Sequence, residues 1–376
     1  MDRPTRVLQI VGGLNHGGIE VLLMSILRGI DRRRFQTDIL IHSEDHGVYG
    51  DEALALGSRV IPCPDPSRPW VYSRGFRCAV REFGPYDVVH SHVYFYSGFI
   101  MHLARGCGIP KRIAHCHNDR ADMESRAGLA RRIYAAAMRR LVARDATIGL
   151  GVSRGAARNM FGPGWESDGR WRVVHCGIDL SEFRNTVDSG AVRCELGIPQ
   201  SALVIASAAR FVHAKNHAFI LKVAQHVAEY DPNFRLLLIG DGPLRPEVEQ
   251  EVAETGLLDR TIFTGMRLDV RRLLLGAIDI LLMPSFHEGL PVVLMEAQAA
   301  NVPCVISDVI TDELDVNKEL IHRVSLSRPA AEWAETVMQM GRSGSPIDAA
   351  DALDAMKASP FNVESGIREL EAIYES

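Results

Sequence analysis

The stretch IDILLMPSFHEGLPVVLMEAQAANVP, residues 278–303, combines a strand, a loop and a helix. The apolar run that ends at Pro284 is typical of a buried strand, and residues 291–300 form an apolar helical segment that stops before Pro303. Glu288 and Glu296 lie within these apolar surroundings. Carboxylates are almost never fully buried unless they are paired or bind something. The two glutamates therefore indicate a site at a strand-to-helix turn.

The rest of the chain repeats this alternation of strand and helix, which is typical of parallel, doubly wound α/β sheets. A Gly- and Pro-punctuated polar stretch predicts a linker near 182–192. We therefore expect two Rossmann-like domains that face a central cleft. They would be residues 1–185, joined by a C-terminal helix at 361–376 that packs back, and residues 192–358. Strands are predicted at 6–11, 37–42, 87–92, 111–117, 146–153, 201–211, 234–240, 260–265, 278–284 and 302–306.

The bulk properties exclude several classes of protein. A net charge of −5 over 376 residues gives no basic excess for a nucleic-acid partner. No apolar run reaches the roughly 18 to 20 residues of a membrane span, and the N-terminus lacks a signal-peptide core. The seven cysteines are widely spaced without a C-x-x-C pair, which favours reduced thiols in the cytoplasm over disulfides or a zinc site.

The loop at 284–291 suits an anionic ligand. A helix N-terminus offers free N–H groups and a positive dipole end, which favour phosphate. Glu296 could hold the vicinal hydroxyls of a ribose, and Glu288 a second hydroxylated group beyond the phosphates. Arg210, which ends another strand, and Lys215, in the loop after that strand, supply cations for a diphosphate. These features together predict a nucleotide-sugar site.

The segment EGLPVVLME resembles the E-x7-E motif of retaining glycosyltransferases of family 4, which have the GT-B fold. The resemblance extends over nearly the whole chain in collinear order. It includes GGLNHGGIE, IAHCHND, LGVSRGA, VVHCGIDLSEF, AARFVHAKN, LLLIGDGPLRPEVE, IFTGMRLDVRRLL and SDVITDELDV. The chain is most similar to the branch that builds bacterial capsular and exopolysaccharides.

The resemblance implies transfer of a hexose or N-acetylhexosamine from an NDP-sugar to a lipid-linked or oligosaccharide acceptor. The anomeric configuration would be retained, and neither a metal nor another cofactor would be required. The first domain would bind the acceptor and the second the donor, with UDP favoured over GDP. The catalytic residues implied are Glu288, His117, Arg210 and Lys215. The donor-binding residues implied are Glu296, Gly289, Leu290, Pro291, Val292, Met266, Gly265, Arg210 and Lys215.

Other residues have a structural reading beside the functional one. The loop of Asn15, His16, Gly17 and Gly18 is either a tight turn or an acceptor and phosphate loop. His90, His92 and Tyr94 either touch the acceptor or fill a loop core, and Ser153 is expected to be a helix N-cap. His115 falls inside a strand, which leaves His117 as the better candidate for the reacting centre.

A helical segment near 126–144 carries six arginines among alanines and leucines. It is either a solvated face or a basic amphipathic surface for an anionic membrane, which would make the protein peripheral on the inner face. The arginines are Arg126, Arg131, Arg132, Arg139, Arg140 and Arg144.

Three other functions remain open. A nicotinamide dehydrogenase would need G-x-G-x-x-G after the first strand, whereas GGLNHGGIE places its glycines at other offsets. A GT-B epimerase or hydrolase would act on the donor without an acceptor. A non-catalytic sugar-nucleotide-binding subunit would have no need of the two glutamates and two cations together.

Overall fold

The computed structural model describes residues 3–15, 17–63, 65–117, 128–175 and 177–376. The chain divides into unit 1, residues 1–179 with 360–376, and unit 2, residues 180–359. The chain first passes from unit 1 to unit 2 between Asp179 and Leu180, ahead of the linker expected near 182–192. The reason is that Phe183, in the short 3-10 turn Ser181–Arg184, is buried and stacks beneath Arg271 of unit 2.

Unit 1 contains a seven-stranded sheet in the order β3-β2-β1-β4-β5-β6-β7, and every pair is parallel. Five of the strands correspond to the predicted ones. The other two, β3 and β7, are three-residue strands at the two edges, too short to show an apolar period. The strands are β1 Thr5–Val11, β2 Phe35–Ile41, β3 Val60–Pro62, β4 Val88–Ser91, β5 Lys111–Cys116, β6 Ile148–Gly151 and β7 Trp171–Val173.

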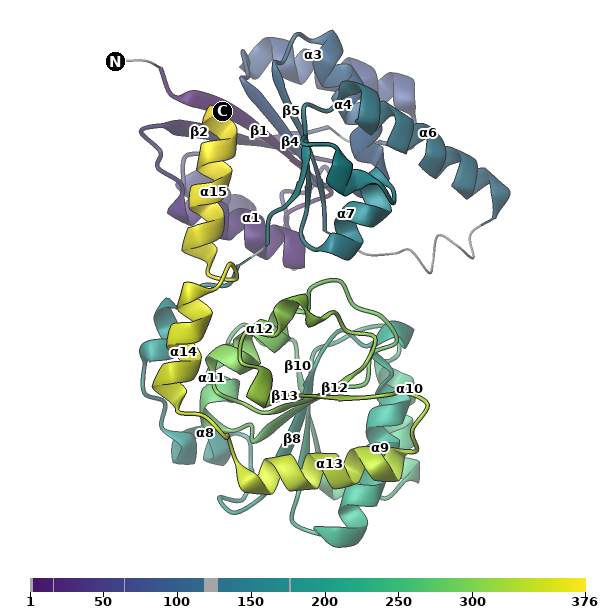
Figure 1. The fold of residues 1–376 in the computed structure, drawn as a ribbon, viewed down its shortest axis with the longest axis vertical. Coiled ribbons are helices and arrows are strands. Elements are labelled where there is room, and N and C mark those ends of the chain that lie inside the picture. Colours follow the sequence, from purple (N-terminus) through teal and green to yellow (C-terminus); the bar gives the residue numbers. More distant parts are fainter. Residues whose placement is uncertain (1–2, 16, 64, 118–127, 176) are drawn as a thin grey trace. The chain divides into compact units, whose positions relative to one another are not determined.

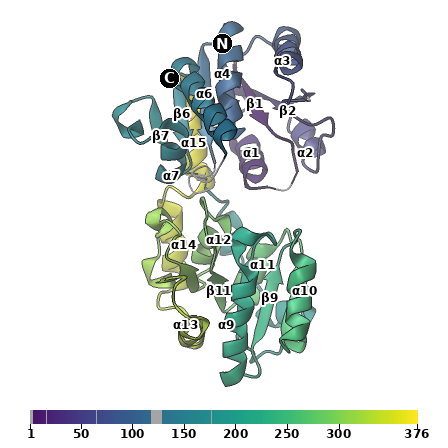
Figure 2. The same ribbon diagram turned by 90° about the vertical axis from the view of Figure 1, so that its right-hand side faces the viewer.

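Unit 1 includes helix α15, although this helix lies at the C-terminal end of the chain. Its apolar face packs with α1 against the sheet, so that Ile367, Leu370 and Tyr374 share a core with residues of β1, β4 and β5 (Figures 1 and 2). The helices are α1 Gly18–Gly29, α2 Gly50–Ala55, α3 Pro69–Phe83, α4 Ser97–Gly106, α6 Leu129–Asp145, α7 Arg154–Phe161 and α15 Val363–Glu375.

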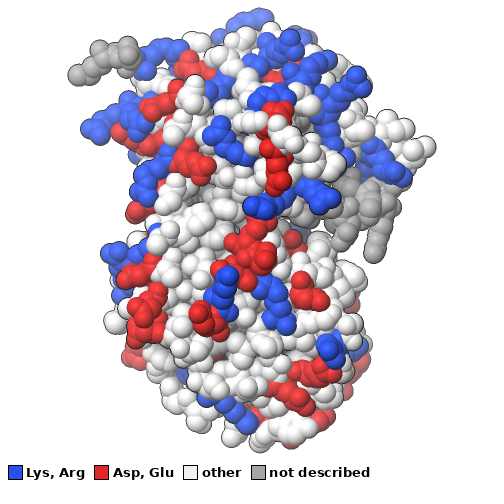
Figure 3. All heavy atoms as spheres, viewed as in Figure 1, with Lys and Arg blue, Asp and Glu red and all other residues white. Residues whose placement is uncertain are grey.

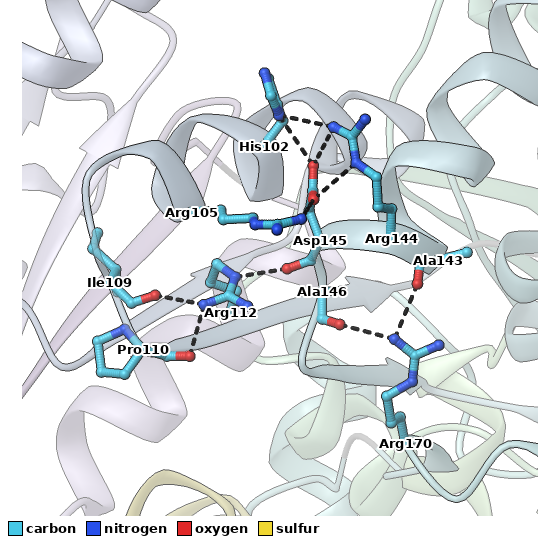
Figure 4. A network of polar contacts seen from close by, with 10 residues as sticks. All are labelled: His102, Arg105, Ile109, Pro110, Arg112, Ala143, Arg144, Asp145, Ala146 and Arg170. Carbon is cyan, nitrogen blue, oxygen red and sulfur yellow. Dashed lines mark hydrogen bonds and ion pairs between the residues drawn. The ribbon is translucent and has the colours of Figure 1, made fainter.

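A polar network fixes the C-terminal end of α6 (Figure 4). The fully buried carboxylate of Asp145 accepts from Arg144 at 2.7 Å, Arg105 at 2.8 Å and His102 at 3.1 Å. Arg144, with Arg105 and His102, holds the pKa of Asp145 far below its usual value. Arg112 of β5 donates to the Asp145 carbonyl at 2.6 Å. These cations offset an acid at the negative end of the helix dipole and tie α6 to α4 and β5.

Unit 2 contains a six-stranded parallel sheet in the order β10-β9-β8-β11-β12-β13. Its core includes the fully buried Trp333. The edge strand β13 was not among the predicted ones. The strands are β8 Val204–Ala208, β9 Arg235–Ile239, β10 Thr261–Gly265, β11 Ile280–Met283, β12 Cys304–Ser307 and β13 Ile321–Val324. The helices are α8 Ser189–Glu195, α9 His217–Tyr230, α10 Arg245–Glu254, α11 Val270–Gly276, α12 Val292–Ala299, α13 Ala330–Ser343 and α14 Ala349–Ala358.

Both sheets reverse their strand order at one point, between β1 and β4 in unit 1 and between β8 and β11 in unit 2. The predicted fold class, two Rossmann-like domains with parallel sheets, is confirmed. In such sheets ligands bind outside the carboxyl ends of the strands at the point of reversal. The loops that follow β1, β4, β8 and β11 are therefore where functional side chains are expected.

Candidate active site

Two loops meet at the reversal point of unit 2. Asn216, in left-handed conformation with φ 57° and ψ 46°, begins α9 and donates from Nδ2 to the Pro284 carbonyl at 3.1 Å. The Phe286 amide donates to the Ala214 carbonyl at 2.9 Å, and the rings of His213 and Phe286 stack with centroids 5.0 Å apart. The loop after β8 is thus fastened to the loop after β11.

These contacts between the two loops bring Lys215 next to Glu288. The ammonium Nζ lies 2.6 Å from Oε1 and 2.5 Å from Oε2 of the carboxylate, whose side chain is only 7% exposed. Ser285 donates to Glu288 Oε1 at 2.7 Å, and its carbonyl accepts from Ser307 of β12 at 2.7 Å. The Lys215 ammonium and the Ser285 hydroxyl therefore hold the Glu288 carboxylate in place, and the Ser307 hydroxyl holds the backbone of Ser285.

Helix α12 begins at Val292, with Pro291 as its N-cap. Pro291 was expected inside the first turn, but its ψ of 110° places it just before the helix, and its carbonyl accepts from the Leu294 amide at 3.1 Å. The missing proline N–H therefore removes none of the helix's own first donors. The N–H groups of Val292 and Val293 precede the first intrahelical bond and are available to an anion.

Glu296 is the fifth residue of α12 and is largely buried. Burial raises its pKa to about 7, and the nearby Arg271 guanidinium acts in the opposite direction. Among the described residues, Glu296 makes no hydrogen bond or ion pair. A buried carboxylate without a partner is costly, so a ligand with hydroxyl donors would stabilise its charged form.

The remaining candidates of unit 2 lie at neighbouring strand ends. Arg210 was expected to end its strand, but β8 stops at Ala208, so Arg210 lies two residues beyond it and is exposed. Gly265 ends β10 with φ 68°, which suits glycine, and Met266 beside it is 61% exposed. Gly289 and Leu290 are partly exposed within the Glu288 loop.

The glycine loop of unit 1 follows β1. Asn15 is exposed, and Gly17 adopts an extended conformation before α1 begins at Gly18. A Cβ on Gly17 would collide with the carboxylate of Glu20 in the first turn, which gives this glycine a packing reason. His16 lies outside the described residues.

Four histidines gather between β4 and β5 in unit 1. His90 Nε2 lies 3.0 Å from His115 Nδ1, and His92 Nδ1 lies 2.8 Å from His117 Nε2. His90, His92 and His115 are buried, whereas His117 just beyond β5 is partly exposed. Burial lowers the pKa of all four, to about 3 for His90 and His117, so they are neutral at pH 7.

Two further residues complete this cluster. Tyr374 of α15 lies 2.7 Å from His90 Nδ1, and Gln9 of β1 reaches Tyr374 Oη at 2.9 Å and His92 Nε2 at 2.8 Å. Sequence reasoning missed both, although Gln9 is the one polar residue in the apolar run VLQIV. It also missed Ser285.

His90 and His92 are both buried within this cluster, which favours the alternative in which they fill the core over contact with the acceptor. Tyr94 donates to Asn159 at 2.8 Å, and Ser153 caps α7 by accepting from the Ala156 amide at 3.1 Å, as predicted.

His90, His92 and His115 each place a ring nitrogen within 4.8 Å of the others, close enough to suggest a metal site. Five of their six ring nitrogens already have hydrogen-bond partners, and His115 Nε2 alone has none among the described residues. Three metal bonds would have to replace several of these contacts. The hydrogen-bonded arrangement therefore accounts for the cluster better than a metal.

Two family models cover most of the chain. "Glycosyl transferase 4-like domain" matches residues 17–177, and "Glycosyl transferases group 1" matches residues 189–345. The chain is 38% identical to EpsF of Bacillus subtilis, named as a glycosyltransferase, over 91% of this chain and 89% of EpsF.

This chain is a family 4 glycosyltransferase.

The resemblance drawn from the motifs is thereby confirmed. The glycosyltransferase is also 22% identical to the capsular polysaccharide biosynthesis glycosyltransferase CapH of Staphylococcus aureus, over 99% of both chains. Its fold matches the crystal structure of Anabaena HepE in complex with UDP and glucose, with a TM-score of 0.81 and 16% identity over 99% of this chain and 100% of HepE. The fold of this glycosyltransferase is GT-B.

Proposed function

We propose that this glycosyltransferase moves a hexose or N-acetylhexosamine from an NDP-sugar, with UDP favoured, to a lipid-linked or oligosaccharide acceptor in polysaccharide biosynthesis. The observation that carries the proposal is the Lys215–Glu288–Ser285 arrangement at the reversal point of unit 2. Glu296, which has no hydrogen-bond or ion-pair partner among the described residues, follows in helix α12. The complex of HepE with UDP and glucose supports the donor, and the part of CapH in capsular polysaccharide biosynthesis supports the pathway class.

In this proposal the donor spans the N-terminus of α12. The amides around Leu290 and Val292 bind the sugar and phosphates, with Gly289 and Pro291 shaping the loop. Glu296 accepts from the ribose hydroxyls, and the base lies against Gly265 and Met266. Because no described residue pairs with Glu296, ribose binding would satisfy a carboxylate that is otherwise buried at a cost.

Arg210 and Lys215 would stabilise the departing diphosphate, together with the dipole of α12. Glu288 would contact the transferred sugar. Because Glu288 pairs with Lys215, the carboxylate that contacts the sugar would also hold the ammonium close to the position of the phosphates. The proposal also includes retention of configuration without a metal or other cofactor, which is what the family resemblance implies.

Unit 1 would hold the acceptor. His117, at the end of β5, would touch the reacting hydroxyl, and the loop of Asn15, His16, Gly17 and Gly18 would line the acceptor or phosphate side. All of these residues follow β1 or β5, on either side of β4 in the sheet order.

The proposal includes an anionic membrane as a partner of α6 and a place on the cytoplasmic face. Only Ala135, Val142 and Asp145 of its 17 residues are buried, and Leu129 and Ile133 are 72% and 61% exposed. Figure 3 shows Lys and Arg gathered over the part of unit 1 where α4 and α6 lie. Exposed apolar side chains among arginines are the features of an interfacial helix.

The contacts of α6 reduce the set of arginines that could meet a membrane. Arg139 donates to the Asn159 carbonyl and stacks on Phe95, and Arg144 is paired with Asp145. Arg126 lies outside the described residues, which leaves the exposed Arg131, Arg132 and Arg140. Among the described residues no helix is long and apolar enough to cross a bilayer.

A thermal-shift panel of UDP, GDP, ADP and their sugars tests the donor site. A ligand at 100 times its Kd raises the stability of the folded state by about 2.7 kcal/mol, so UDP should raise the Tm by several degrees. No response to any nucleotide would refute the proposal. Product analysis separates the rivals, since a new sugar epimer, or free sugar formed without an acceptor, would indicate an epimerase or a hydrolase.

A further inference from the structure

One side of helix α3 in unit 1 is buried, and the opposite side is basic. The buried residues of α3 are Tyr72, Phe76 and Ala79. Because successive helical residues are rotated by about 100°, four exposed side chains fall within a stripe about 60° wide on the other side of the helix. This α3 stripe consists of Trp70, Arg74, Arg77 and Arg81.

The three arginines of the α3 stripe have no carboxylate to neutralise them among the described residues. Within the part of the chain that the structure describes, Arg74, Arg77 and Arg81 form no hydrogen bond and no ion pair. Arg105 of α4 and Arg144 of α6 differ, because both are paired with the Asp145 carboxylate. An exposed guanidinium without such a pairing keeps its full charge for an anionic partner.

Trp70 is the apolar member of the α3 stripe. Its side chain is 72% exposed in the first turn of α3, and Val71 beside it is 43% exposed. Tryptophan is enriched where the headgroups of a bilayer meet its hydrocarbon, because its ring is amphipathic. Arginine beside it adds attraction to anionic lipids. Exposed apolar side chains next to arginines are typical of a helix that lies in the plane of a membrane surface.

The α3 stripe belongs to a larger basic face. Helix α4 packs against both α3 and α6, so these three helices form one layer on the side of the sheet opposite α1 and α15 (Figure 1). Helices α3, α4 and α6 carry three, one and five arginines, against only two acidic residues, Glu82 and the buried Asp145. The whole chain has a net charge of −5, so this layer concentrates positive charge on one face of a chain that is acidic overall.

We propose that α3 is a second membrane contact of unit 1, in which Trp70 lies among the headgroups of an anionic bilayer and the three arginines of the α3 stripe lie over anionic lipids. The inference rests on the proposed function for its membrane partner and assigns that partner α3 in addition to α6. It does not depend on the donor, the acceptor or sugar transfer. A soluble anion would bind the arginines but would leave Trp70 and Val71 without a role, so a lipid surface fits the whole stripe.

The first test uses Trp70 as the reporter in the full chain. With phosphatidylglycerol vesicles, the tryptophan emission should shift to shorter wavelength, and lipids brominated near the headgroup end of their acyl chains should quench it. Trp70→Phe should lose both effects. Trp165→Phe is the matched control, because Trp165 is a partly exposed tryptophan of the same unit, and it should keep both effects. The remaining tryptophans, Trp171 and Trp333, are buried.

The second test removes the charges of the α3 stripe. Replacing its three arginines with Gln should weaken vesicle binding at 0.1 M salt about 100-fold, or about fivefold for each arginine. The matched control makes the same change of charge at exposed arginines of unit 1 outside α3, α4 and α6. These are Arg32, Arg158 and Arg172. The control should weaken binding far less, because charges beyond a Debye length of about 10 Å are screened. All six positions are exposed, so thermal unfolding should confirm that both triple variants fold.

The outcomes separate this inference from the proposed function. Vesicle binding without quenching of Trp70, or equal binding by the two triple variants, would overturn the inference and leave α6 as the membrane contact. A dimer in sedimentation velocity that Trp70→Phe dissociates, without vesicle binding, would overturn it in favour of a second copy of the chain. A chain that binds vesicles through Trp70 but does not bind UDP would refute the proposed donor site and leave the α3 contact standing.

Discussion

Lys215 and Glu288 are 73 residues apart in the chain, yet the ammonium of the first lies 2.5 Å from the carboxylate of the second. The contact exists because β8 and β11 are neighbours in the sheet although β9 and β10 separate them in sequence. It places opposite charges together at the point where parallel sheets bind their ligands. This pair therefore links the fold of unit 2 to its proposed chemistry.

Glu288→Gln should abolish most of the transfer while the chain still binds UDP. The amide keeps the shape but loses the charge that contacts the moving sugar, and we expect kcat to fall about 100-fold, with the UDP Kd changed by less than about tenfold. Steady-state kinetics and calorimetric titration measure the two quantities. Glu319→Gln, an exposed glutamate of the same unit, should change neither. Unchanged turnover in Glu288→Gln would disprove its role.

Lys215→Met should destabilise unit 2 because it leaves a nearly buried carboxylate without its counter-ion. Removing one partner of a buried pair costs about 3 kcal/mol or more, and adding Glu288→Gln should recover much of that loss. Urea denaturation of the wild type, both single variants and the double variant gives the coupling free energy between Lys215 and Glu288. Lys222→Met, an exposed lysine on α9, is the control. Additive losses would mean that the two side chains do not depend on each other.

Glu296 should make UDP binding depend on pH. Its pKa is raised on folding from 4.5 to about 7, so its stability contribution is complete below pH 4.5 and is lost as pH rises through about 7. Ribose hydroxyls favour the ionised form, so binding should tighten from pH 6 to 8 and release about half a proton near pH 7. Titration calorimetry in buffers of different ionisation enthalpy measures that proton.

Glu296→Gln provides the comparison for that experiment, because it cannot ionise. The release attributable to this side chain should disappear, while any proton lost by the UDP phosphates remains in both proteins. Equal proton release by wild type and variant would show that Glu296 does not meet the ribose.

The histidine cluster should make unit 1 sensitive to acid. The pKa of His90, His92, His115 and His117 is lowered on folding, so their contribution is present above pH 6.5 and is lost as pH falls toward about 3. Each buried neutral histidine adds a slope of up to about 1.4 kcal/mol per pH unit. The protection of the β4 and β5 amides against hydrogen exchange, corrected for the intrinsic exchange rate at each pH, should fall steeply from pH 7.5 to pH 5. His322→Gln, exposed in unit 2, should leave that slope as it is.

Helix α6 should bind anionic vesicles. Replacing Arg131, Arg132 and Arg140 with Gln should weaken binding to phosphatidylglycerol vesicles by about 1 kcal/mol per residue, and Leu129→Ser with Ile133→Ser should weaken it further. Sedimentation of the protein with these vesicles at low and at physiological salt measures the binding. The matched control replaces three exposed cations of unit 2, Lys222, Arg328 and Arg342. Equal binding by both triple variants would refute a specific membrane face.

Much of the fold followed from local patterns. The long buried strands and the helices after them were predictable because apolar runs bounded by turn residues are local properties. The three missed strands, β3, β7 and β13, lie at sheet edges and are three or four residues long, with partly exposed positions that break the pattern. Pro291 was placed one position too far into α12, because the first helical residue depends on backbone angles that composition leaves open.

The sequence by itself determined the alternation of strands and helices, the family and the spacing of Glu288 and Glu296, because these are properties of neighbouring residues. The tertiary structure alone decided which distant groups meet. It paired Lys215 with Glu288, buried Glu296 away from any partner in the part of the chain that the structure describes, and brought Gln9 and Tyr374 to the histidines. Sheet order and the return of α15 join residues far apart in the chain, and burial then sets their charge states by removing water.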